Sequence, residues 1–156
     1  MSSFTEILIA SPLKDGEQWV IRKEFSYYVD KEGGDVITVP AGFISDYASI
    51  PRFLWPFAPR WGKYGKAAVV HDYLYDTHEK TRKEADGIFY DAMVILGTPP
   101  WKAKTMYRSV RMFGGNAYKD HSSYIVGLKK TMIEIPELAE DVCFTDYKDL
   151  LKKSKF

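Results

Sequence analysis

Residues 66–100 read KAAVVHDYLYDTHEKTRKEADGIFYDAMVILGTPP, and this stretch decides the fold. Thr81 and Glu84 have the spacing of a capping box, in which each side chain bonds to the backbone N–H of the other at the start of a helix. We expect that helix to run to Leu96, because Gly97 and the two prolines that follow are typical of a helix end.

A shorter helix is predicted over Lys66 to Asp76, and only about five residues, Asp76 to Lys80, connect it to the next. A connection this short makes the two helices antiparallel neighbours. His71 and Asp86 then lie at a similar depth, roughly 8–9 Å from the loop at about 1.5 Å of rise per residue. The spacing therefore predicts that His71 faces Asp86.

The helix faces support this pairing. His71 and Tyr75 are at i and i+4 and share a face, so the Tyr75 hydroxyl can donate to the same carboxylate. Asp86 lies at the margin of an apolar stripe, where a carboxylate is partly buried and needs a partner. Asp72 points about 100° away from His71, towards whatever segment packs beside the pair.

The remainder of the chain predicts an α+β domain. Residues 1–40 are mainly β, because apolar and polar residues alternate around Trp19 and because Gly33 and Gly34 suit the reversal between FSYYV and VITV. A third helix is predicted from near Pro100 to Gly114-Gly115. We therefore expect a small N-terminal antiparallel sheet packed on a bundle of about three helices, with the antiparallel hairpin at its centre.

We interpret residues 1–156 as a single domain, and the other segments as its less regular parts. Residues 41–62 are proline-rich and apolar, which predicts a packed irregular segment with a short helical turn near Ser49 to Trp55. Residues 63–115 form the helical core, and residues 116–156 are an extension in which SYIVGL is a candidate strand and the end is one or two surface helices.

Composition excludes several classes of protein. The net charge of +1 comes from 22 basic and 21 acidic residues, so nucleic acid is not an expected partner. The single cysteine, Cys143, cannot form an internal disulfide. The N-terminus lacks the pattern of a secretory signal, and no apolar stretch is long enough to cross a bilayer. We expect the protein to work in a reducing cytosol or to travel inside a larger particle.

The predicted cluster has the parts of a water-activating site. A neutral imidazole, His71, can take a proton from water, while Asp86 on its other nitrogen orients the ring and stabilises the imidazolium. Asp72 can contribute to a site for calcium, a cation that needs several oxygen ligands. Asp46, in the irregular segment, is the candidate for a further ligand. Each has a structural alternative: His71 can be a core histidine bonded to Asp86, Asp72 a solvated residue, and Asp46 a helix cap.

The stretch AAVVHDYLYDTHEKTRKEADGIFYDAM resembles the active-site core of the phospholipase A2 superfamily, especially its disulfide-free members. Those proteins share a helix reading H-D-x-x-Y and an antiparallel helix that carries a catalytic aspartate. The resemblance implies that His71 is the general base, Asp72 a calcium ligand, Tyr75 a supporting residue and Asp86 the partner of the base. The glycine-rich calcium loop of that family has no counterpart here, and PAGFISD stands in its place.

A second resemblance covers more of the chain. VPAGFISDYASIPRFLW, KYGKAAVVHDYLY, TRKEADGIFYDAM and MYRSVRMFGG together resemble an uncharacterised family of domains of unknown function that is common in tailed bacteriophages and prophages. This resemblance implies a phage source and no established activity. It also implies that the protein is located in the cytoplasm of the bacterial host or is carried in the virion.

Two classes of function are consistent with these patterns. The first is a phage-encoded hydrolase that acts on a lipid or another small ester or phosphoester. One form of this hypothesis includes calcium as a cofactor. The second is a non-enzymatic phage protein, either a virion or tail-assembly component or a protein that binds a host factor, in which the hairpin is structural. The enzyme requires the His71–Asp86 pair at the base of an open cleft with Asp72 facing the same cavity, whereas a pair sealed in the core favours the structural alternative.

Overall fold

The computed structural model describes residues 2–12, 18–29, 34–45 and 64–118. Within these ranges short strands come first and helices follow, so the predicted α+β class is confirmed. The strands are β1 (Ser3–Phe4), β2 (Ala10–Pro12), β3 (Trp19–Ile21), β4 (Phe25–Tyr28), β5 (Val36–Val39) and β6 (Ile44–Ser45). The helices are α1 (Gly65–Thr77), α2 (Arg82–Ile95), α3 (Pro100–Phe113) and the single turn α4 (Gly115–Tyr118).

The strands form two antiparallel sheets where the sequence predicted one. One sheet has the order β1-β4-β5 and the other has the order β2-β3-β6. The second arises because the chain turns back after Pro40: Gly42 has a φ of 94°, and its N–H donates to the carbonyl of Ile21. This reversal places β6 beside β3, inside the segment predicted to be irregular.

The β4–β5 pair shows why this region is extended. Phe25 lies opposite Val39, and Tyr27 lies opposite Ile37, and all four are buried. On the other face Ser26 and Thr38 lie opposite one another and share a 2.8 Å hydrogen bond between hydroxyls. The alternation predicted from the sequence thus separates a core face from a polar face.

The helices begin and end close to the predicted residues. The capping box is present at α2, where Thr81 N–H donates to Glu84 Oε2 at 2.9 Å. After α2, Gly97 has a φ of 80°, a left-handed conformation that favours glycine. Pro100 occupies the first turn of α3, where its missing N–H leaves no bond unmade.

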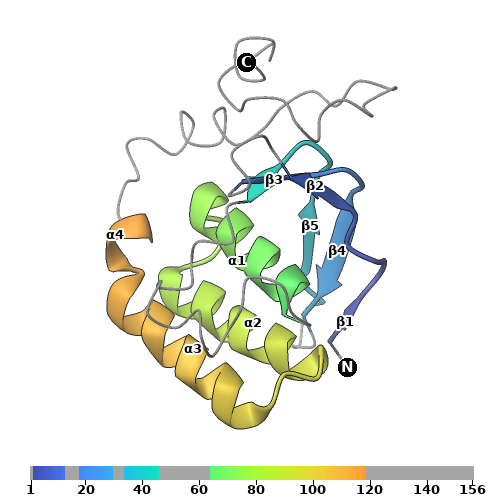
Figure 1. Ribbon diagram of the computed structural model, residues 1–156. Helices are drawn as coiled ribbons and strands as arrows, with labels where there is room; N and C mark the ends of the chain where they lie inside the picture. The colour runs from blue at the N-terminus through green and yellow to red at the C-terminus, as the bar shows by residue number, and fades with distance from the viewer. Residues whose placement is uncertain (1, 13–17, 30–33, 46–63, 119–156) are drawn as a thin grey trace.

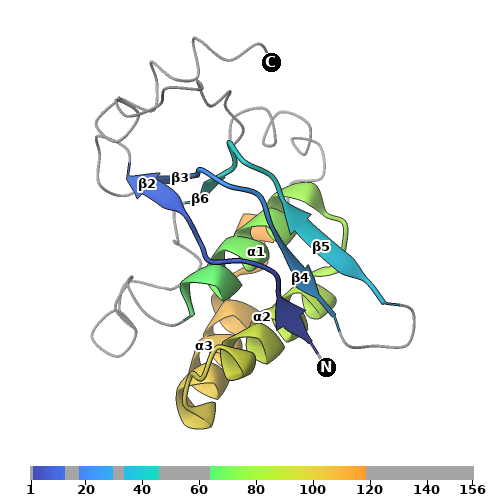
Figure 2. The same ribbon diagram turned by 90° about the vertical axis from the view of Figure 1, so that its right-hand side faces the viewer.

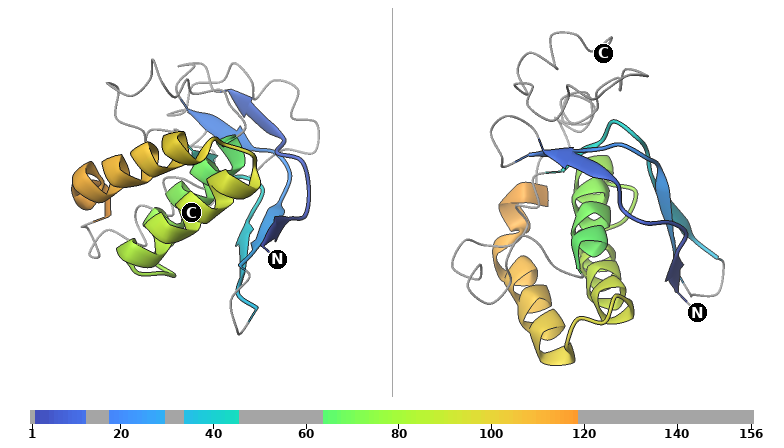
Figure 3. Two further views of the ribbon diagram at one scale, coloured as in Figure 1. Left: turned by 90° about the horizontal axis from the view of Figure 1, so that it is seen from below. Right: turned by 45° about the vertical axis from the view of Figure 1, so that its right-hand side comes forward.

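The helices form layers against the strands. Figure 1 shows α1 beside the strands, α2 antiparallel to it, and α3 on the outer side of α2. Figure 2 places β4 and β5 in front of α1, and the right-hand view in Figure 3 shows α1 and α2 between these strands and α3. Apolar side chains from α1, α2, α3 and the strands form one buried core. None of the helices described is long and apolar enough to span a membrane.

Several sequence predictions fall outside the described residues. These are the helical turn near Ser49 to Trp55, the SYIVGL strand, the surface helices near the end of the chain, and the position of Asp46.

Candidate active site

Local backbone structure defines both ends of the loop that joins α1 to α2. α1 ends at His78, which adopts a left-handed conformation with a φ of 53°. The capping box at Thr81 starts α2 almost immediately. His78 is half-buried, and its Nε2 lies 2.8 Å from the carbonyl of Tyr118. The hairpin is thereby held against α4.

The structure brings His71 and Asp86 together across this hairpin. His71 Nε2 lies 2.8 Å from Asp86 Oδ1, and both side chains are 0% exposed. The Tyr75 hydroxyl donates to the same oxygen at 2.6 Å. The imidazole packs between the rings of Tyr75 and Phe89, with ring centroids 4.1 and 4.8 Å away.

The second oxygen of Asp86 faces two arginines that the sequence did not point to. Arg111 NH1, from α3, donates to Asp86 Oδ2 at 2.7 Å. Arg82 Nε lies 3.9 Å from the same oxygen. Arg82 also donates to the carbonyls of Val110 and Arg111 at the end of α3. The carboxylate is therefore bound from α1, α2 and α3 at once.

These contacts set the charges of the cluster. Burial lowers the pKa of His71, and the nearby Asp86 offsets that effect only in part. Burial acts to raise the pKa of Asp86, but hydrogen bonds from His71, Tyr75 and Arg111 outweigh it, so the pKa is lowered. Burial and Asp86 raise the pKa of Tyr75, and Asp86 raises the pKa of Arg111. At neutral pH the cluster holds a neutral imidazole, an ionised carboxylate and a guanidinium.

The two ring nitrogens of His71 differ in protonation and in hydrogen bonding. An ionised carboxylate only accepts hydrogen bonds, so Nε2 carries the proton of the neutral ring and donates to Asp86. Nδ1 is then left with a lone pair, and it is buried without a hydrogen-bond partner among the residues described. This is the arrangement in which an imidazole can accept a proton from a water molecule.

Asp72 faces a different neighbour, as its position on the helix predicted. The hydroxyl of Ser45, a buried residue of β6, donates to Asp72 Oδ2 at 2.5 Å. Asp46 lies outside the described residues, so its suggested role with Asp72 stays a prediction. Within the ranges described, no group of three or more histidine, cysteine or acidic residues is placed to hold a metal ion.

Gly114 explains how α3 comes so close to Tyr75. A Cβ at this position would lie 2.8 Å from the Tyr75 hydroxyl, a distance that real Cβ atoms do not tolerate. From the sequence, Gly114 was expected only to end a helix. Arg111 was missed because the basic residues of this helix match a solvated face, and nothing in their spacing points to a buried carboxylate.

The comparisons with known proteins bear on this same region. A family described as a protein of unknown function, DUF1353, matches residues 19–110. The chain belongs to the DUF1353 family. The match runs from β3 through most of α3 and includes His71, Asp72, Tyr75 and Asp86.

Two relatives of this DUF1353 chain come from Sinorhizobium fredii. The uncharacterised protein y4jT is 38% identical over 96 residues, which cover 60% of this chain and 28% of y4jT. The uncharacterised protein y4iH is 43% identical over 72 residues, which cover 45% of this chain and 30% of y4iH. The matched segment thus spans less than a third of each relative. No solved structure matches the chain.

Proposed function

We propose that this DUF1353 domain is a hydrolase in which His71 activates water and Asp86 orients the imidazole. The observation that carries the proposal is His71 Nδ1, which is buried and has no hydrogen-bond partner among the described residues. A buried polar atom left unpaired costs about 1–3 kcal/mol, and a role in catalysis is one reason for a protein to keep such an atom.

The charges around the ring suit a general base. The lowered pKa of His71 keeps the imidazole neutral, and therefore basic, at neutral pH. When the ring takes a proton, Asp86 Oδ1 at 2.8 Å stabilises the positive charge. Tyr75 and Arg111 bind the carboxylate from the other directions and hold it in place.

The proposed substrate is an ester or phosphoester, and a phospholipid is the first to test. This class comes from the likeness of His71, Tyr75 and Asp86 to the phospholipase A2 pattern. Calcium belongs to the proposal through Asp72, where the cation would have to replace the Ser45 hydroxyl on Oδ2. A phage source is a further part of the proposal, and the genes beside the one for this chain would test it.

Because His71 and Asp86 are fully buried, the proposed reaction needs an opening that brings water and substrate to Nδ1. The enzyme predicted from the sequence would hold this pair at the base of an open cleft. The structure buries the pair instead, and this burial favours a second candidate function. In that alternative the protein is not an enzyme, and the hydrogen bonds among His71, Asp86 and Arg111 serve only to hold the three helices together. Replacing His71 distinguishes the two candidates.

The test uses His71→Gln, because a glutamine amide can still donate to Asp86 but has no basic nitrogen. Hydrolysis of phospholipid vesicles and of a generic aryl ester is measured with and without calcium. We expect His71→Gln to lose activity by roughly 10²–10⁴-fold. His78→Gln removes a histidine of the same hairpin that does not contact Asp86, and it should keep the activity. Equal rates in wild type and in a folded His71→Gln protein would reject the hydrolase and leave the structural alternative.

A further inference from the structure

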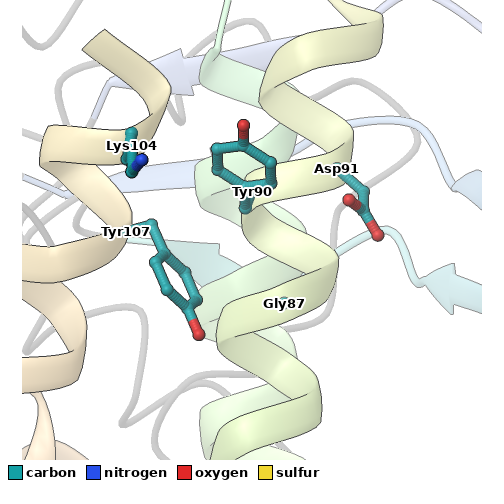
Figure 4. A pocket seen from close by; sticks show the side chains of 5 residues that line it. All are labelled: Gly87, Tyr90, Asp91, Lys104 and Tyr107. Atoms are coloured by element: carbon teal, nitrogen blue, oxygen red, sulfur yellow. The ribbon is translucent and has the colours of Figure 1, made fainter. Parts of the chain in front are cut away.

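A groove runs between α2 and α3 on the outer side of the helical layer. It has a volume of about 300 Å³ and is lined by Gly87, Tyr90 and Asp91 of α2 and by Lys104 and Tyr107 of α3. Figure 4 shows Lys104 and Tyr107 on α3 and Tyr90 on the neighbouring α2, with Gly87 below Tyr90 on α2. None of these residues belongs to the His71 network, so a ligand of this groove would be independent of the proposed hydrolase.

Gly87 is unusual because nothing in the fold requires it. It lies inside α2, where glycine destabilises a helix relative to alanine. A Cβ at Gly87 would meet no atom within 4 Å, and its backbone is not in the left-handed conformation that would favour glycine. The missing side chain therefore leaves open space at the base of the groove.

The walls of the groove are aromatic. The rings of Tyr90 and Tyr107 meet edge to face, with centroids 5.8 Å apart and planes at 66°. Both side chains are only partly buried. Tyrosine faces that remain open in this way suit a planar ring, which stacks on one and meets the edge of the other.

The charge that faces the groove is positive. Lys104 has no ion-pair partner in the part of the chain that the structure describes, although Asp91 lines the same groove. Figure 4 shows the Asp91 carboxylate turned away from α3. In agreement, after the effect of burial, Asp91 contributes to raising the pKa of Tyr27 on β4. The ammonium of Lys104 is thus the charge available to a ligand.

We infer that this groove binds a small aromatic carboxylate. A volume of about 300 Å³ is at the lower end for small-molecule pockets and holds one ring with a short substituent. One ammonium balances one carboxylate, and the two tyrosines cover the ring. A ligand seated there would occupy the space that Gly87 leaves open.

The test is a titration of the full chain with benzoate, followed by backbone amide NMR. We expect shifts that saturate, with a Kd on the order of millimolar, and that centre on α2 and α3 around the groove. Cyclohexanecarboxylate, which lacks the planar ring, and benzyl alcohol, which lacks the charge, should each bind at least about 5-fold more weakly. Equal affinity for all three compounds would overturn the inference.

Variants locate the site. Lys104→Gln should weaken benzoate at least about 5-fold, whereas Arg108→Gln, which removes a charge from the exposed side of the same helix, should not. Gly87→Met should fill the groove and abolish binding. Gly87→Ala is a folding control and should raise the unfolding temperature by roughly 2–4 °C. Unchanged benzoate binding in Gly87→Met or Lys104→Gln would show that the ligand binds elsewhere and would refute the site.

Discussion

Arg111 links α3 to the buried carboxylate of Asp86. Its side chain is 34% exposed, yet its guanidinium donates to one oxygen of Asp86, whose side chain is 0% exposed. The cation stabilises the negative charge of Asp86 and so reduces the attraction of Asp86 for a proton on His71. After the effect of burial, Arg82, which lies 3.9 Å from the same carboxylate, contributes to lowering the pKa of His71, and we expect Arg111 to act in the same direction through Asp86.

Arg111→Met tests this role. Without the guanidinium, Asp86 is compensated by fewer donors, so the pKa of His71 should rise and imidazolium should form at higher pH. The stability of the fold should fall by about 1–3 kcal/mol, because a buried acceptor loses its partner. NMR titration of the His71 ring and urea unfolding measure the two effects.

Arg108→Met is the matched control, because Arg108 is exposed on the same helix. It should change neither the pKa of His71 nor the stability by more than a few tenths of a kcal/mol. A His71 pKa that stays constant in Arg111→Met would show that Arg111 does not govern the charge of this cluster.

The site could be predicted only where short-range spacing determines geometry. A loop of about five residues places His71 opposite Asp86, and an i, i+4 spacing adds Tyr75, so these contacts follow from the sequence. Arg111 arrives from a separate helix, and its direction depends on how α3 crosses α2. The bond between Ser45 and Asp72 likewise depends on a strand pairing over a long separation.

At the scale of elements, the boundaries of α2 and α3 depend on a few strong local signals. Thr81 and Glu84 start α2, Gly97 ends it, and Pro100 opens α3, all as the sequence predicted. The strands were harder to assign because β6 has only two residues, and its pairing with β3 is set by the reversal at Gly42. Local patterns therefore predict the helices better than the sheets.

Gly114→Ala probes the contact between α1 and the end of α3. Gly114 has a φ of −73°, so its backbone conformation does not require glycine, but the new Cβ would lie 2.5 Å from the Val110 carbonyl oxygen and 2.8 Å from the Tyr75 hydroxyl. We expect a loss of about 1–3 kcal/mol in the free energy of unfolding, as for other overpacked sites. Urea denaturation measures it.

Gly87→Ala provides the opposite control, since its Cβ enters open space and should stabilise the protein by about 0.5–1 kcal/mol. If Gly114→Ala leaves the stability unchanged or raises it as Gly87→Ala does, close packing is not what limits this position.

At the scale of the whole molecule, the carboxylate of Asp86 is buried between layers of secondary structure. α1 and α2 lie between the strands and α3 (Figure 3). The His71–Asp86 pair, which these two helices carry, is fully buried. Its protonation is therefore coupled to unfolding of the entire domain.

Stability should accordingly fall in mild acid. The folded pKa of His71 is below the value of about 6.5 for an unfolded histidine. As pH drops through about 6.5, the unfolded chain takes up a proton that the folded protein does not, so the free energy of unfolding decreases by up to about 1.4 kcal/mol per pH unit. The lowered pKa of Asp86 extends this loss below about pH 4.

Urea unfolding between pH 8 and pH 5 measures this slope. In His71→Gln the contribution of this residue should disappear, and the curve should be flatter between pH 7 and pH 5. A variant with the wild-type slope would show that other groups control the acid sensitivity.

The carboxylate of Asp86 also bears on how the chain folds. A hairpin of α1 and α2 alone would satisfy Oδ1 through His71 and Tyr75. Its Oδ2 would have only the Arg82 ion pair at 3.9 Å and would still need water as a hydrogen-bond donor until Arg111 arrives. Removing that water before α3 docks would leave a charge poorly compensated in an apolar interior. We therefore expect α3 to dock and water to leave the core in a single step. This disfavours a compact folding intermediate in which only α1 and α2 are packed.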